Sequence, residues 1–108
     1  MSTDLKKDAI KYDSSKPKYS LLSPFALDEL AKVATFGANK YQPHNWRKGF
    51  DYSRLLDAAN RHIIEYQKGY KTDDDSKLPH LAHAMWNLMA LLEQDILNTG
   101  KDDLYKFK

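Results

Sequence analysis

Cysteine is absent from the 108-residue sequence, which excludes disulfide bonds and thiolate metal sites. A chain without disulfides suits a reducing compartment. Long apolar runs are also missing, since a membrane helix needs roughly 20 apolar residues. The most apolar stretch, residues 81–92, is interrupted by His83 and Asn87. The first residues are polar and unlike a signal peptide. We therefore expect a cytoplasmic protein that does not interact with membranes.

A strong excess of one charge is lacking too, because the formal net charge is only +2. This balance argues against general nucleic-acid binding. The distribution is uneven: residues 1–54 have ten basic and six acidic residues, whereas residues 55–108 have seven and nine. No acidic residue occurs between Glu29 and Asp51, an interval that contains Lys40, Arg47 and Lys48. The sequence thus predicts a locally basic segment rather than a basic protein.

Three helices are predicted, and no segment has a convincing strand pattern. Ser23 and Pro24 are typical of an N-cap and a first helical residue, and Pro43 sets the latest end of this helix. A second helix is expected from near Ser53 to about residue 68, and a third from about 78 to 98. Residues 1–20 would form an irregular arm and 99–108 a tail or short final helix.

The fold class is therefore all-α: one domain, residues 1–108, built as a small bundle of three main helices. The third helix is apolar on most sides, and such helices usually lie at the centre of a fold or between subunits. Three helices make a thin bundle, so we expect a homo-oligomer to complete it. The alternative is a monomer in which the arm and the other helices cover the third helix.

The segment 41–52 is predicted to be a loop, because it has neither a helical nor a strand period. Arg47 is suited to a bidentate grip on phosphate oxygens, with Lys40 or Lys48 adding a point charge. Trp46 is suited to stacking on a base, although an isolated tryptophan is more often a core residue. Asn45 offers an amide that can read a purine edge. We interpret this loop, with His44, as a binding site for a phosphorylated small molecule.

All four histidines lie in or near these elements. On the third helix, His80, His83 and Asn87 are spaced i, i+3 and i+7 and form one polar face, and His62 falls among the apolar positions of the second helix. Together with Arg61 they extend the proposed ligand site; the alternative is ordinary hydrogen bonding between helices. A three-histidine zinc site from His62, His80 and His83 is a weaker hypothesis. Asp73-Asp74-Asp75 lacks the spacing of a calcium loop and is expected to be solvated.

Several short motifs occur in order along the chain. They are Lys11-Tyr12-Asp13, Lys16-Pro17, Leu21-Leu22, Thr35-Phe36-Gly37-Ala38, Lys40-Tyr41, His44-Asn45-Trp46-Arg47-Lys48-Gly49, Arg61-His62 and Leu78-Pro79-His80-Leu81-Ala82-His83-Ala84. Taken together, they resemble a phage-borne family described as dATP/dGTP diphosphohydrolase, N-terminal, over residues 11–93. The resemblance implies a phage origin, host-cell cytoplasm as the location, purine nucleotide ligands and kinship with the all-α MazG-type nucleotide pyrophosphohydrolases.

The magnesium-binding E-x-x-E and E-x-x-D pair of MazG-type enzymes is absent from this sequence. By helix order, His80-x-x-His83 stands where E-x-x-D would fall, and magnesium prefers oxygen ligands. We therefore expect no cofactor and direct binding of phosphate by cationic side chains. If the chain is an enzyme, Mg²⁺ or Mn²⁺ is expected, with Asp57, Glu65, His80 and His83 as ligands.

Three functions remain open, and no catalytic residue is assigned. The first is a protein that binds a purine nucleotide, or a cyclic or ADP-ribose-type defence signal, without cleaving it. The second is a metal-dependent dATP/dGTP diphosphohydrolase. The third is a helical protein-interaction module. The ligand residues expected for the first are Lys40, His44, Asn45, Trp46, Arg47, Lys48, Arg61, His62, His80 and His83.

Overall fold

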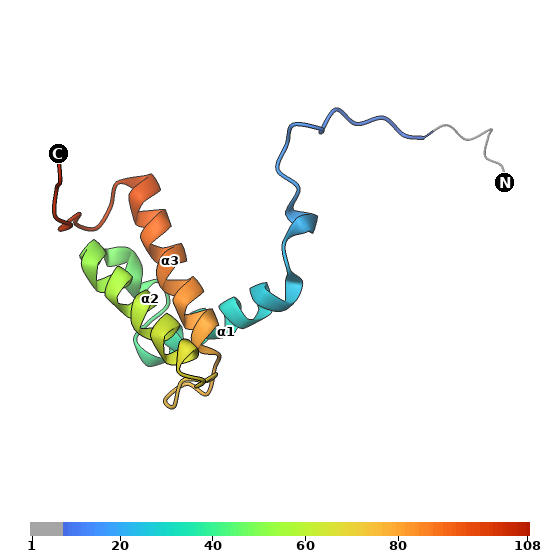
Figure 1. The fold of residues 1–108 in the computed structure, drawn as a ribbon. Coiled ribbons are helices and arrows are strands. Elements are labelled where there is room, and N and C mark those ends of the chain that lie inside the picture. The colour runs from blue at the N-terminus through green and yellow to red at the C-terminus, as the bar shows by residue number, and fades with distance from the viewer. Residues whose placement is uncertain (1–7) are drawn as a thin grey trace.

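The computed structural model describes residues 8–108 and contains three α-helices (Figure 1). They are α1 (Pro24–Lys40), α2 (Tyr52–Gln67) and α3 (His80–Leu97), and short 3-10 turns occupy Tyr19–Leu21 and Asn45–Lys48. Within residues 8–108 there are no strands, only two isolated bridges, Asp51 to Lys101 and Thr72 to Pro79. The predicted all-α class is confirmed.

Local chemistry accounts for the helix ends. Ser23 caps α1, because its side-chain oxygen accepts a hydrogen bond from the backbone N–H of Ala26, and Pro24 is the first helical residue. The third helix begins at His80, two residues later than predicted, because Pro79 is extended with ψ 137°. It ends at Asn98, which has the left-handed backbone (φ 57°) common just after a helix.

α3 lies at the centre and packs against both α2 and α1 (Figure 1). Small side chains on α3 let the neighbouring backbones approach closely, and they meet larger residues of the other helices. Polar groups at the same face are buried as well, with Gln94 only 1% exposed and His80 7% exposed. The buried apolar residues are Val33 of α1, Tyr52, Leu55 and Ala59 of α2, and Ala82, Ala84 and Ala90 of α3.

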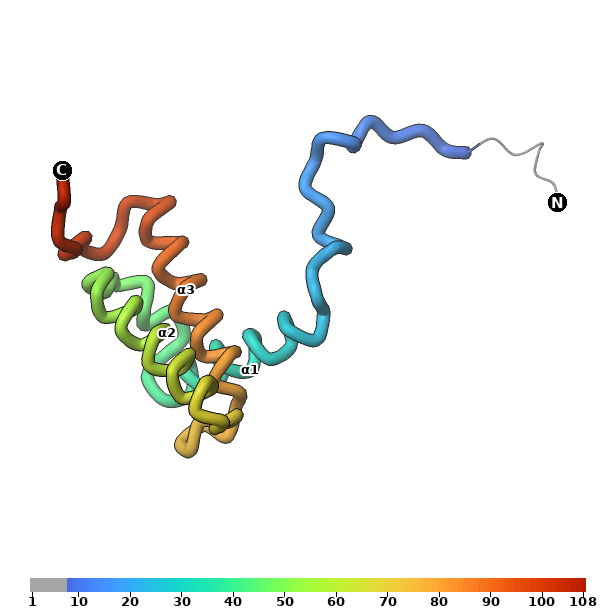
Figure 2. Tube along the Cα trace, in the orientation of Figure 1, coloured from blue at the N-terminus to red at the C-terminus, as the bar shows by residue number. Residues whose placement is uncertain are grey.

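The segment that precedes α1, residues 8–22, extends away from the three helices (Figure 2). The radius of gyration is therefore 19.2 Å, against about 13 Å for a compact domain of about 100 residues. Apolar side chains along this segment are exposed, among them Ile10, Tyr12 and Leu21. The remainder of the predicted arm, residues 1–7, lies outside the described residues.

One face of α3 is apolar and exposed, so within the described residues the arm and the other helices do not cover this helix on all sides. Within this chain α1 and α2 cover only the opposite face. Leu88 is 46% exposed and Leu92 is 58% exposed. Their spacing places them on one side of the helix. We name this row the α3 stripe: Leu81, Met85, Leu88, Leu92 and Ile96.

The C-terminal residues form a tail without a final helix, and they hold the start of α2 in place. The backbone N–H of Tyr52 donates to the carbonyl of Lys101 (2.9 Å), and Asp103 accepts from the backbone of Ser53 (2.9 Å). Gly100 allows this close approach, because a Cβ there would lie 2.7 Å from the carbonyl oxygen of Phe50. No helix in residues 8–108 is long and apolar enough to cross a membrane.

Candidate functional site

The loop between α1 and α2 is more ordered than predicted, because Asn45–Lys48 forms a 3-10 turn. The turn follows His44, which has a left-handed backbone (φ 63°), and it ends at Gly49 with φ 103°. A 3-10 turn advances about 120° per residue, so consecutive side chains point in different directions. Arg47 therefore lies over α3, whereas Lys48 is exposed and lines neither of the pockets described below.

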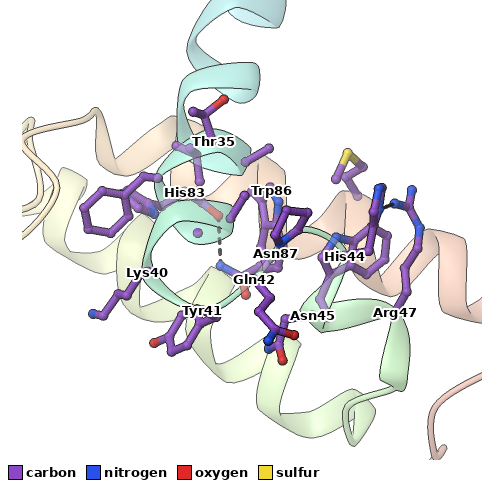
Figure 3. A pocket seen from close by; sticks show the side chains of 18 of the residues that line it. Thr35, Lys40, Tyr41, Gln42, His44, Asn45, Arg47, His83, Trp86 and Asn87 are labelled. Atoms are coloured by element: carbon purple, nitrogen blue, oxygen red, sulfur yellow. Dashed lines mark hydrogen bonds between the residues drawn. The ribbon is translucent and has the colours of Figure 1, made fainter.

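A pocket of about 640 Å³ lies between the end of α1, this loop and the middle of α3 (Figure 3). Figure 3 shows Lys40 and Arg47 on opposite sides of it, with Trp86 and Asn87 of α3 between them. We call it the first pocket. Seven of the ten predicted ligand residues line it: Lys40, His44, Asn45, Trp46, Arg47, His62 and His83.

Aromatic rings form much of one wall of the first pocket. Trp46 meets Trp86 edge to face, with ring centroids 5.8 Å apart, and the guanidinium of Arg47 lies 4.4 Å from the Trp46 ring centroid. The indole N–H of Trp86 is buried and, among the described residues, has no hydrogen-bond acceptor. Trp46 is thus both a packing residue and a pocket residue, so the two interpretations of its role are compatible.

Arg47 already has a carboxylate partner in this structure, namely Glu93 of α3. Its Nε and Nη2 atoms donate to the two carboxylate oxygens at 2.9 and 3.1 Å, and Nη1 contacts Nδ1 of His44. The hydrogen bond to Arg47 lowers the pKa of Glu93, so the pair is ionised at neutral pH. The predicted phosphate grip therefore requires exchange of Glu93 for phosphate.

Lys40 has an acidic partner as well. Its Nζ lies 3.0 Å from a carboxylate oxygen of Asp75, in the loop that precedes α3. The same nitrogen lies 5.8 Å from the ring centroid of Phe36 and 5.6 Å from that of Tyr41. Both members of this ion pair are substantially exposed, so the pair is weak and an anionic ligand can compete for the lysine.

A second pocket, of about 610 Å³, lies beyond His62 and takes three of the predicted ligand residues: Arg61, His62 and His80. Nδ1 of His62 lies 2.8 Å from Nδ1 of His80, and the His62 ring stacks on His83 with centroids 4.6 Å apart. Of the ten predicted residues, His62 alone lines both pockets, and Asp73 lines both as well. Nine of the ten therefore fall into two adjoining sites rather than a single constellation, and Lys48 lies outside both.

Burial keeps the stacked histidines neutral. Desolvation lowers the pKa of His62, and the neighbouring His83 and His80 lower it further. Desolvation also lowers the pKa of His83, although Asp73 acts against it. Ser76 Oγ accepts a hydrogen bond from the backbone N–H of Leu78, so its O–H is free to donate to Nε2 of His83 at 2.6 Å. The Nε2 lone pair of His83 is therefore engaged by Ser76.

The acidic loop before α3 is only partly solvated, which corrects the prediction for Asp73. Asp74 and Asp75 are exposed, but Asp73 is half-buried beside His80. Hydrogen bonds close the loop: the N–H of Asp73 donates to the carbonyl of Leu78, and the N–H of His80 donates to that of Lys71, both at 2.9 Å. Burial acts to raise the pKa of Asp73, but hydrogen bonds from Ser76 lower it overall.

The carboxylates expected as metal ligands in an enzyme do not meet the histidines. Asp57 is exposed and lines neither pocket, and Glu65 lines the second pocket but pairs with Lys68 at 3.0 Å. His83 contacts Ser76 rather than His80. The donors that do converge are two imidazoles and one carboxylate, which do not fit Mg²⁺, an ion that prefers oxygen ligands. The predicted set Asp57, Glu65, His80 and His83 is therefore not brought together in this structure.

Three contributors were absent from the prediction: Asp73 as a site residue, Glu93 and Gln94. Gln94 accepts from the backbone N–H of Phe50 (2.9 Å) and donates to its carbonyl (3.1 Å), which fixes the loop against α3. The available signal for Glu93 and Gln94 was that they are adjacent polar residues on an otherwise apolar helix. Their spacing alone does not show which loop residue each one contacts.

The comparison with protein families now bears on this site. Residues 6–104 match the family model described as dATP/dGTP diphosphohydrolase, N-terminal. The chain belongs to this family. A relative from Salmonella phage PMBT28, named dATP/dGTP diphosphohydrolase, is 42% identical over 80 residues. That match covers 74% of this chain and 27% of the relative, so the chain spans about a quarter of the relative's length. No solved structure matches the chain significantly.

Proposed function

We propose that this chain binds a purine deoxynucleoside triphosphate, dATP or dGTP, in the first pocket and contributes to its hydrolysis. The observation that carries the proposal is the pocket itself, where aromatic rings lie between two cationic side chains that have exchangeable partners. The family description and the phage relative's name supply the class of nucleotide and favour a phage protein that works in the host cytoplasm.

Size and chemistry of the first pocket suit this ligand. Its volume, about 640 Å³, is in the range of small-molecule sites, about 300–1,000 Å³. A purine would stack on the aromatic wall, and its ring nitrogens would offer an acceptor for the unpaired N–H of Trp86 after a small shift. Phosphate oxygens would displace Glu93 from Arg47 or Asp75 from Lys40, because exposed ion pairs contribute only about 0–1 kcal/mol.

The proposed reaction consumes one water molecule. The water oxygen bonds to the α-phosphorus, and the bond from this phosphorus to the oxygen that bridges the α- and β-phosphates breaks. The products are a deoxynucleoside monophosphate and inorganic pyrophosphate. Arg47 and Lys40 would neutralise charge on the phosphates. The proton of the attacking water passes to bulk solvent.

Incubation of the protein with each of the four dNTPs, with and without Mn²⁺ or Mg²⁺, followed by mass spectrometry of the products, tests the proposal. We expect dAMP or dGMP with diphosphate, and little product from dCTP or dTTP. Tight binding with the nucleotide recovered intact would reject hydrolysis and favour capture without cleavage. The comparisons give capture no support, because the relative is named for hydrolysis. Absence of both binding and turnover would favour the protein-interaction module.

We also propose that the chain functions as a homo-oligomer, because the apolar side chains of the α3 stripe and of the extended segment 8–22 are exposed within the described residues. Burial of exposed apolar surface is the main driving force of association. A second copy presents both surfaces at once, and the small net charge of +2 opposes self-association only weakly.

A further inference from the structure

The imidazoles of His62 and His80 and the carboxylate of Asp73 converge from three different segments of the chain. His62 is in the middle of α2, His80 begins α3, and Asp73 lies in the loop between these helices. Their candidate ligand atoms all lie within 4.8 Å of one another. We propose that these three side chains bind one divalent transition-metal ion of the Zn²⁺, Mn²⁺ or Co²⁺ type.

The two Nδ1 atoms give the clearest sign of a ligand pair. At 2.8 Å they face each other, and each offers a lone pair when its ring carries the proton on Nε2. Two nitrogen ligands of a tetrahedral ion lie about 3.3 Å apart, for a metal–nitrogen distance of about 2.05 Å. A small outward movement of the two rings therefore makes room for an ion. A simple hydrogen bond between the histidines, with Asp73 only closing its loop, is the competing explanation that the test below separates.

Groups around the three donors hold them in orientation. The ring of His62 stacks on His83 at an interplanar angle of 12°, and the backbone N–H of Ser76 donates to Asp73 Oδ2 at 2.8 Å. The loop that presents Asp73 is closed by its two backbone hydrogen bonds, Asp73 to Leu78 and His80 to Lys71. Such second contacts fix ligand geometry and are typical of metal sites.

The donor set and its exposure define the type of site. Two nitrogen donors and one oxygen donor suit borderline ions and disfavour Mg²⁺. Three protein ligands leave further coordination positions, and all three residues line the open second pocket. Water or a phosphate oxygen can therefore reach the ion, as in catalytic rather than structural sites. Arg61, in the same pocket, supplies a cation for an anionic ligand.

The test is a titration of EDTA-treated, dialysed protein with Co²⁺, followed by visible absorption and isothermal calorimetry. We expect one ion per chain, and the variants Asp73→Asn and His80→Ala should weaken binding more than about 10-fold. His44→Ala is the matched control, because His44 is exposed and lies outside the cluster. Asp73→Asn preserves shape, and circular dichroism checks that each variant folds.

No binding of Co²⁺, or equal binding by Asp73→Asn and the parent protein, would overturn the metal site and favour a simple histidine pair. The titration contains no nucleotide, so it stands apart from the proposed hydrolysis. Metal binding without nucleotide turnover would reject the reaction and keep the site. Turnover that persists in EDTA, in a protein that binds no Co²⁺, would reject the site and keep the reaction.

Discussion

Nδ1 of His62 and Nδ1 of His80 lie 2.8 Å apart, although the two residues are 18 positions apart and belong to different helices. The pairing joins α2 to the first turn of α3 and puts a polar contact where the first and second pockets adjoin. A buried polar pair of this kind is costly unless it has a bonding role. The contact therefore marks a part of the helical core that is suited to ligand or metal binding.

Arg47 should contribute strongly to nucleotide binding. Arg47→Ala removes the cation on one side of the first pocket, and a charge-assisted hydrogen bond contributes about 1.5–3 kcal/mol, so we expect the Kd for dATP to rise about 10-fold or more. Calorimetry measures the change. Lys48→Ala is the matched control, because Lys48 is adjacent, cationic and outside both pockets. Equal effects of the two substitutions would indicate general charge attraction instead of a specific contact.

Glu93 should compete with the nucleotide for Arg47. Glu93→Gln removes a negative charge while a side-chain oxygen remains, so we expect dATP affinity to rise by up to about fivefold, the equivalent of about 1 kcal/mol. Glu29→Gln, which disrupts the exposed pair with Lys32, should leave the affinity unchanged. If Glu93→Gln instead weakens binding, the ion pair serves to position the loop and is not displaced by phosphate.

Gln94 should be a major stabilising residue. Gln94→Ala removes two hydrogen bonds to the backbone of Phe50 and leaves its partly buried N–H unpaired, and we expect the free energy of unfolding to fall by about 2–4 kcal/mol. Urea denaturation followed by circular dichroism measures this. Gln67→Ala, at the exposed end of α2, should change the free energy by less than about 0.5 kcal/mol. A similar small loss for Gln94→Ala would mean that the loop is held by other contacts.

The α3 stripe should mediate association. Leu88→Lys introduces a charge in the middle of the exposed apolar row, so we expect light scattering after size-exclusion chromatography to report a lower mass than for the parent protein. Ile64→Lys is the control, since Ile64 is 49% exposed but lies on α2, away from the stripe. A parent protein that is already monomeric would contradict the proposed oligomer.

The helices could be predicted because their signals are local. Ser23 and Pro24 define a start, and apolar spacing defines the buried faces. The loop residues of the site could also be predicted, since His44 to Arg47 are consecutive. The ion pair of Arg47 with Glu93 could not, because the partners are 46 residues apart and meet only after α3 has packed. The sequence alone places Lys48 beside Arg47 as a phosphate ligand, because the 3-10 turn that points their side chains in different directions has no clear sequence pattern.

Asp73 shows the same limit at the histidine cluster. The sequence favours a solvated acidic loop, and only the backbone hydrogen bonds around Leu78 and Lys71 bring this one carboxylate inward. Helical spacing predicts that His62 faces inward, and it places His80 on the polar face of the third helix. Their contact, however, depends on how α2 and α3 are aligned, which spacing within one helix does not determine.

The most direct measurement is photolabelling with 8-azido-dATP, followed by mass-spectrometric mapping of the modified peptide. We predict label on the walls of the first pocket, on the 41–50 loop or around Trp86, with suppression by excess dATP or dGTP but not by dCTP. Label on the outer α3 stripe, or equal suppression by dCTP, would contradict a purine nucleotide site in the first pocket.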